Sequence, residues 1–190
     1  SNTFFTKNIT VLVYGNWKNQ TKNIKSFFTA TYNHEDRQIP KTRNYSASLK
    51  FVFVGSLVEG KRPLFAIQII EKLNTLGYDV VIDIYGDGVL KTDLETYVKK
   101  NNLGSKVKLF GNQKNEVIKD VLKEAHFLIL ASKSEGWPKA IAEAMFFGVI
   151  PIATSISCVA FMLDYGKRGI IIKPNLEDAL HEINIQLVAP

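Results

Sequence analysis

Two carboxylates and a proline, set around the start of one predicted helix, are the residues of this sequence best suited to chemistry. Glu135 and Glu143 stand on either side of Pro138. Proline fits the first position of a helix, and the N–H groups that follow it have no partner within the helix. Such a helix end favours an anion such as phosphate, while carboxylates accept hydrogen bonds from sugar hydroxyls. A ligand with a diphosphate in its middle and hydroxyls at both ends would suit this arrangement.

Spacing alone leaves a structural interpretation of the same residues open. Glutamates eight positions apart, such as Glu135 and Glu143, are common in proteins. An acidic residue near a helix start is favoured by the helix dipole, which is sufficient reason for Glu135. Glu143 could then be merely solvated. The elements around the two residues must therefore be considered.

Strands and helices alternate along the chain from Leu49 onward. Strand-like runs rich in β-branched and aromatic residues end at glycines, and helix-like runs carry apolar residues three and four positions apart. The predicted strands are 51–54, 80–85, 107–110, 127–130, 149–153 and 169–172, and the predicted helices begin near Pro63, Leu90, Val117, Pro138 and Leu176. This order predicts an α/β domain, Rossmann-like with three layers and a parallel sheet, that binds ligands at the carboxyl ends of its strands.

Composition fits one soluble globular domain with an additional N-terminal segment. The chain has 190 residues, of which 46% are hydrophobic and 22% charged. Residues 1–48 carry seven Lys/Arg against two Asp/Glu, hence +5, whereas residues 49–190 carry 17 against 16, hence +1. A basic arm can bind nucleic acid or an anionic membrane surface. No Arg-rich run is present, so we favour a solvated connection for residues 1–48 and expect no nucleic-acid partner. Within it, residues 9–14 could form a strand, and residues 16–45 are expected to be extended.

The remaining reactive side chains predict no other chemistry. Cys158 lies in an apolar stretch, which favours a small buried side chain over a nucleophile. His34, His126 and His181 are scattered, and we interpret His126 as a structural residue at the start of a buried strand. No Cys/His cluster or Asp-x-Asp pair has metal-ligand spacing, so we predict no metal site.

The ordered set of motifs resembles the C-terminal domain of glycosyltransferase family 4. That domain carries a glutamate, seven residues and a second glutamate, followed by glycine and a proline-containing strand. Here the segment reads Ser132-Lys-Ser-Glu135-Gly136-Trp137-Pro138, then Glu143-Ala144, Gly148 and Pro151-Ile-Ala-Thr154. The resemblance extends over residues 49–187 and includes Gly86-Asp87-Gly88 and Phe110-Gly111. It implies one half of a GT-B fold.

The resemblance also implies a role for each site residue. Glu135 would bind donor-sugar hydroxyls, and Glu143 the ribose hydroxyls. Lys61 would neutralise the diphosphate and the charge that builds on it as it departs. With Glu135 it forms the implied catalytic pair. The other implied donor-binding residues are Arg62, the backbone of Gly136, Trp137 and Pro138, Lys139, and Asn112 and Gln113 near the base.

The sequence departs from the family pattern at three positions. Ser56 stands where the family often has arginine, and Arg62, beside Lys61, could supply the missing charge. Pro138 stands where glycine is usual. Lys139 adds a positive charge at the helix N-terminus, where the dipole disfavours it. That cost makes sense if an anion binds there, although Lys139 could also simply face solvent.

The implied reaction is transfer of a sugar from a nucleotide sugar, UDP- or GDP-linked, to an acceptor hydroxyl, with retention and without metal or cofactor. The resemblance implies that residues 49–190 form the C-terminal domain and that residues 1–48 form the inter-domain connection. It also implies that the acceptor, a glycan or lipid-linked sugar, binds to an N-terminal domain before Ser1. We therefore expect a hexosyltransferase-like half-enzyme that is inactive alone. The implied setting is cytoplasmic, at the inner face of the cell membrane with peripheral association of the full-length protein, in cell-surface or extracellular glycan synthesis.

Two alternatives remain at this point. One is another GT-B enzyme, such as a sugar-nucleotide epimerase, which would need a carboxylate–histidine acid/base pair. The other is a non-catalytic nucleotide-binding module. The presence of both Glu135 and Lys61 favours the transferase.

Overall fold

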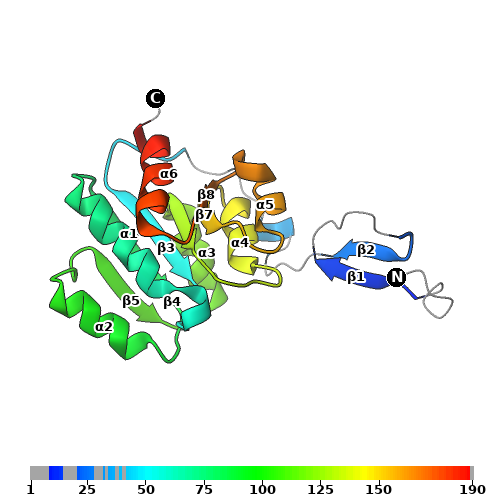
Figure 1. Cartoon of the computed structure of the whole chain (residues 1–190), viewed down its shortest axis with the longest axis horizontal. Helices are drawn as coiled ribbons and strands as arrows, with labels where there is room; N and C mark the ends of the chain where they lie inside the picture. The colour runs from blue at the N-terminus through cyan, green and yellow to red at the C-terminus, as the bar shows by residue number, and fades with distance from the viewer. Residues whose placement is uncertain are drawn as a thin grey trace.

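A six-stranded parallel sheet forms the centre of the molecule (Figure 1). The computed structural model describes residues 9–14, 21–27, 32, 34–36, 39 and 42–188. The strands follow the order β5-β4-β3-β6-β7-β8. Their bounds are β3 (Leu49–Val54), β4 (Val80–Tyr85), β5 (Val107–Gly111), β6 (Phe127–Leu130), β7 (Ile150–Thr154) and β8 (Ile170–Ile172). The predicted Rossmann-like α/β class is confirmed.

The chain reverses its direction of travel across the sheet between β3 and β6. From β3 it winds outward to β4 and β5, returns to β6 beside β3, and then winds outward to β7 and β8. The point where strand order reverses is where open parallel sheets bind ligands. The helices that make these crossovers are α1 (Pro63–Thr75), α2 (Lys91–Lys100), α3 (Asn115–Glu124), α4 (Lys139–Phe146) and α5 (Val159–Met162), and α6 (Leu176–Val188) follows β8.

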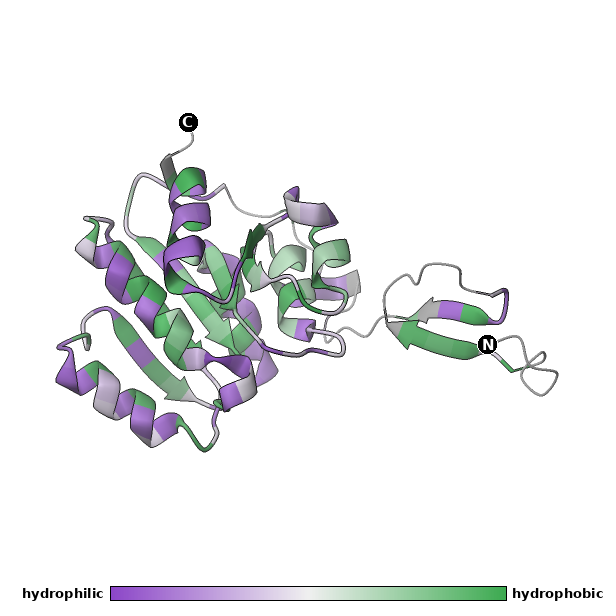
Figure 2. Cartoon of the chain, viewed as in Figure 1, coloured by the Kyte–Doolittle hydropathy of each residue, from purple (hydrophilic) through white to green (hydrophobic). Residues whose placement is uncertain are grey.

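The core lies between the sheet and its helices. All four residues of β6 are buried, as expected for a central strand covered on both faces. Hydrophobic residues concentrate on the strands, and polar residues occur mainly on the helices and loops (Figure 2). Helix α1 packs against α6, and α3 packs beside α4. Because α3 and α4 both run antiparallel to the strands, their N-termini lie at the carboxyl edge of the sheet.

Two glycines let the loops after β3 and β4 approach backbone to backbone. Gly86 has φ +139°, and a Cβ there would lie 1.9 Å from the carbonyl oxygen of Gly55. A Cβ at Gly88 would lie 2.5 Å from the carbonyl oxygen of Leu57. The backbone N–H of Leu57 donates to the carbonyl of Asp87 at 2.9 Å. The glycine motif is therefore required by the packing of these loops.

The structure differs from the sequence-based expectations at three places. Helix α4 begins at Lys139, one position later than predicted, and Pro138 is its N-cap instead of its first residue. The segment expected to be extended contains a strand, β2 (Ile24–Phe27), which pairs in parallel with β1 (Val11–Tyr14), and a 3-10 turn, η2 (His34–Asp36). Helix α5 and the turn η4 (Asp164–Gly166) were not anticipated, since both are too short to show a period.

Candidate functional site

Lys61 and Glu135, the two residues implied to be catalytic, meet at the switch point of the sheet. Lys61 ends the 3-10 turn η3 (Glu59–Lys61) in the loop after β3, and Glu135 lies in the loop after β6. The Lys61 Nζ lies 2.5 Å from Glu135 Oε1, and Ser132 Oγ donates to the same oxygen at 2.6 Å. The pairing brings together two loops that are 74 positions apart in the sequence.

The two partners of this ion pair are buried to different extents. The Glu135 side chain is 6% exposed, whereas that of Lys61 is 28% exposed. The contacts from Lys61 and Ser132 both use Oε1, and among the described residues Oε2 makes no hydrogen bond. The carboxylate is thus held in place by one oxygen while the other can accept a hydrogen bond from a ligand.

Further hydrogen bonds fix the loops that carry this pair. Thr154, at the end of β7, donates from Oγ1 to the carbonyl of Ser132 at 2.6 Å. The backbone N–H of Lys133 donates to the carbonyl of Gly60 at 2.7 Å, and its Nζ lies 2.6 Å from Glu59 Oε1. Three strand ends therefore cooperate to position Glu135. The sequence motif contains Ser132 and Thr154 but assigns neither a role, although a hydroxyl three residues before Glu135 could have indicated Ser132.

The N-terminus of α4 follows directly after this loop. The carbonyl of Pro138 accepts the N–H of Ile141 at 3.0 Å, which closes the first turn. The carbonyl of Gly136 accepts from Cys158 Sγ at 3.5 Å. Lys139 is exposed and forms no hydrogen bond or ion pair with any residue that the structure describes. A free cation thus stands at a helix end that itself favours anions.

Trp137 and Cys158 flank this helix end without reactive geometry. Trp137 is half-buried and lines a groove of about 610 Å³ with Met145, Phe146 and Phe161. Burial raises the pKa of the Cys158 thiol, which favours the unreactive protonated form. The structural interpretation of Cys158 is supported.

Glu143 lies on the side of α4 that faces α3. It is 9% exposed and lines a small cavity with Tyr32, Asn115 and Lys119. Burial and the nearby Glu143 charge both raise the pKa of Tyr32. Glu143 is therefore directed toward the neighbouring helix, whereas Glu135 faces the loop after β3. The two glutamates occupy different sides of the start of α4.

Arg62 is adjacent to Lys61 in sequence but is held elsewhere. Its NH2 group donates to the carbonyl of Pro174 at 3.0 Å, and its guanidinium lies 4.5 Å from the centre of the Phe65 ring. It borders a cavity of about 590 Å³ together with Ser132, Thr154 and Lys173. Ser56, where the family often has arginine, is exposed.

Asn112 and Gln113 stand at the same edge of the sheet, after β5. Both are exposed, and Gln113 Nε2 donates to the carbonyl of Phe110 at 2.8 Å. The carbonyl of Gly111 accepts the N–H of Gly86 at 2.9 Å, which joins the loops after β4 and β5. The loops after β5, β4, β3 and β6 thus form one continuous edge. A cavity of about 940 Å³ is bordered by Leu49, Tyr78 and Ile170 at the opposite edge.

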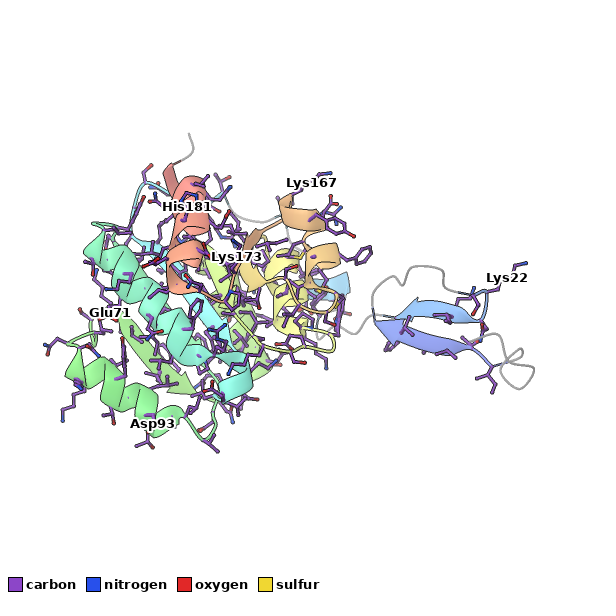
Figure 3. The ribbon with its side chains drawn as sticks, in the orientation of Figure 1. Lys22, Glu71, Asp93, Lys167, Lys173 and His181 are labelled. Carbon is purple, nitrogen blue, oxygen red and sulfur yellow. The ribbon has the colours of Figure 1, made fainter. Side chains whose placement is uncertain are left out.

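None of the histidines whose side chains are described lies at the carboxyl edge of the sheet. His126 is buried at the start of β6, where Nδ1 accepts the N–H of Lys50 at 3.0 Å and Nε2 lies 3.2 Å from the carbonyl of Asn44. His181 is exposed on α6 (Figure 3). The side chain of His34 lies outside the described residues. No acid/base pair of the epimerase type is therefore seen among the described side chains.

None of the described helices has the length and apolar character needed to span a bilayer. Among the described residues, no group of three or more His, Cys, Asp or Glu side chains is arranged to hold a metal ion.

Comparison with known proteins relates this geometry to an enzyme family. Residues 34–189 match the family "Glycosyl transferases group 1". An uncharacterized glycosyltransferase of Methanocaldococcus jannaschii is 29% identical over 175 residues, covering 83% of this chain and 43% of the relative. An α-1,4-N-acetyl-D-galactosaminyltransferase of Campylobacter jejuni is 34% identical over 105 residues, covering 55% of this chain and 28% of the relative. The chain spans less than half the length of these curated relatives.

Solved structures show the same fold. WaaG, a glycosyltransferase involved in lipopolysaccharide biosynthesis, superposes with a TM-score of 0.74 at 17% identity, covering 95% of this chain and 54% of that one. Staphylococcus aureus TarM, solved as a mutant with UDP and sugar ligands, gives a TM-score of 0.72 at 21% identity, covering 89% of this chain and 33% of that one. The six-stranded domain thus corresponds to one half of a GT-B fold. With more than half of its length matched, the chain belongs to the glycosyl transferases group 1 family.

Proposed function

We propose that this chain is the donor-binding half of a retaining glycosyltransferase that moves a sugar from a UDP- or GDP-linked donor to an acceptor hydroxyl. The observation that carries the proposal is the Lys61–Glu135 pair at the switch point of the sheet. When the bond between the sugar and the diphosphate breaks, negative charge grows on the departing diphosphate. A fixed ammonium beside that position stabilises the charge without a metal ion. Glu135 Oε2 would accept a hydrogen bond from the donor sugar.

The start of α4 would hold the diphosphate beside this pair. Pro138 has no N–H to donate, so the backbone offers one donor fewer than a glycine would. Lys139 stands next in sequence, exposed and unpaired among the described residues. Its ammonium would compensate for the missing N–H. Arg62 would first have to leave Pro174 to contribute, so we assign it the lesser role.

The nucleoside would extend from the diphosphate toward α3. Glu143 would hold the ribose hydroxyls, since it lies between α4 and α3 and beyond the first turn of α4. Asn112 and Gln113, at the end of β5, would lie near the base. The backbone of Gly136 and Trp137 would line the sugar and phosphate positions. This order places the sugar at Glu135 and the nucleoside on the opposite side of α4.

The acceptor would bind on a second domain that faces this edge of the sheet. The relatives are more than twice as long as the part this chain matches. Curated relatives include enzymes that act on undecaprenol-diphosphate-linked sugars. We therefore propose a glycan or lipid-linked sugar acceptor, with surface-glycan synthesis as the setting. Residues 49–190 would form the donor domain and residues 1–48 the connection.

Calorimetry with UDP, GDP and their sugars, in EDTA, tests this proposal. We expect Glu143→Ala to weaken binding of the free nucleoside diphosphate, because a lost hydrogen bond to a carboxylate costs roughly 1.5–3 kcal/mol. Glu135→Ala should mainly weaken binding of the sugar-bearing donor. Glu177→Ala, an exposed glutamate on α6, is the matched control. Binding that needs added magnesium, or equal losses for both variants with nucleoside diphosphate alone, would contradict the assignment.

A further inference from the structure

One arginine of the connecting segment joins the C-terminal ends of two helices. Arg43 Nε donates to the carbonyl of Ala125, NH1 donates to Gly148 at 2.9 Å, and NH2 donates to Phe147 at 2.8 Å. NH2 also reaches Leu122 at 3.2 Å. Leu122 belongs to the last turn of α3, Ala125 follows that helix, and Phe147 and Gly148 follow α4. One guanidinium therefore bridges the ends of both helices.

The chemistry of the guanidinium explains why arginine suits this place. The last carbonyls of a helix have no partner within it, and the helix dipole makes that end negative. A guanidinium carries five N–H donors in a rigid planar fork and remains charged. It can satisfy carbonyls of two helices at once, whereas a lysine ammonium is a single point that cannot span both.

Two more contacts attach the same segment along the length of α3 and α4. Asp36 forms an ion pair with Lys119 of α3 at 2.7 Å. The Tyr32 ring stacks on Phe146 of α4, with ring centres 3.9 Å apart. We call the segment from Tyr32 to Arg43 the strap and base its description on Tyr32, Asp36 and Arg43. Through these three residues it contacts both helices.

The strap holds the helices whose N-terminal ends form the proposed nucleotide site. Helices α3 and α4 have 10 and 8 residues, so each spans about 12–15 Å from Arg43 to the carboxyl edge of the sheet. Arg43 is therefore too far away to touch the ligand. Its contacts instead fix the spacing between α3 and α4, and Glu143 lies in that space beside Tyr32.

We infer that Arg43 is a positioning residue for nucleotide binding, acting through the α3–α4 spacing that places Glu143. This inference rests on the proposed function, since it takes Glu143 to bind the ribose. The strap packs against the donor domain. Its contacts with α3 and α4 attach the connecting segment to the two helices that would hold the nucleotide. The family match begins at residue 34, within this strap.

A double-mutant cycle between Arg43 and Glu143 tests the inference. UDP and GDP are first titrated into the 190-residue chain, and the nucleotide that binds more tightly is used for all variants. The titrations are done at a temperature well below the unfolding midpoint of the least stable variant. We expect Arg43→Lys, which keeps the charge but loses the fork, to raise Kd roughly tenfold, the lower end of what a weakened hydrogen bond to the Glu143 carboxylate costs. The double variant with Glu143→Ala should be little worse than Glu143→Ala alone.

Hydrogen exchange and a control variant separate positioning from general destabilisation. In Arg43→Lys, amide exchange should accelerate at the N-terminal turns of α3 and α4 more than in β3 and β4. Arg168→Ala, an exposed arginine of the turn after α5, should leave Kd within twofold of the original. Additive effects of Arg43→Lys and Glu143→Ala, or an unchanged Kd for Arg43→Lys, would overturn the inference. A chain that binds neither UDP nor GDP would instead overturn the proposed function.

Discussion

The unequal burial of the Lys61–Glu135 pair predicts that its two partners are not equivalent for stability. Lys61→Met leaves a carboxylate that is 6% exposed without its cation. Removing one partner of a buried pair costs about 3–5 kcal/mol, and we expect about 2 kcal/mol here because water reaches the Lys61 side. Glu135→Gln leaves an ammonium that is 28% exposed and can be hydrated, and Ser132 can still donate to the amide oxygen. We expect that variant to lose at most about 1 kcal/mol.

Thermal unfolding of the single and double variants measures this difference. For 190 residues the entropy of unfolding is about 0.4 kcal/mol per kelvin, so a loss of about 2 kcal/mol lowers Tm by about 5 °C. The double variant Lys61→Met/Glu135→Gln buries no uncompensated charge and should be more stable than Lys61→Met alone. A double variant as unstable as Lys61→Met, or a Glu135→Gln variant less stable than Lys61→Met, would refute this account of the pair.

Three further predictions concern pH, the glycine loops and the reaction. Burial, together with the charges of Arg43 and Lys50, lowers the pKa of His126 in the folded chain. Folding therefore favours the neutral imidazole, and stability should fall as the pH drops below about 6.5, the pKa of histidine in the unfolded chain. Urea unfolding at pH 7.5 and 5.5 measures this fall, which should shrink in His126→Gln. Gly88→Ala should cost roughly 1–3 kcal/mol because its Cβ meets the Leu57 carbonyl, whereas Gly60→Ala, with no atom within 4 Å, should change the urea midpoint little. The isolated chain should transfer no sugar while the full-length protein does, because positioning of the acceptor is missing. Comparable transfer rates for the two would disprove the half-enzyme proposal.

The sequence by itself determined the sheet and predicted the loops that carry the candidate site. The continuously apolar run of β6 and the strand at Val80–Tyr85 were predicted with their observed bounds. Glycines mark the ends of β3, β4 and β5, and a proline marks the start of α4. These signals are local, because hydrophobic period and backbone freedom depend on neighbouring residues. They locate the loops after β3, β4, β5, β6 and β7 at the carboxyl edge, and the ordered motif identified the family.

Only the tertiary structure decided which polar groups meet. Lys61 and Glu135 are 74 positions apart, and Arg43 reaches carbonyls 79 to 105 positions away. The segment that holds Arg43 has no hydrophobic period, so sequence analysis read it as a connection, and β2 within the same stretch was missed. Burial of Glu143 against α3 was also not predictable, because its environment depends on how two crossover helices pack. Periodicity shows which face of an element is apolar, but the partner of a polar side chain is set by the arrangement of elements far apart in the chain.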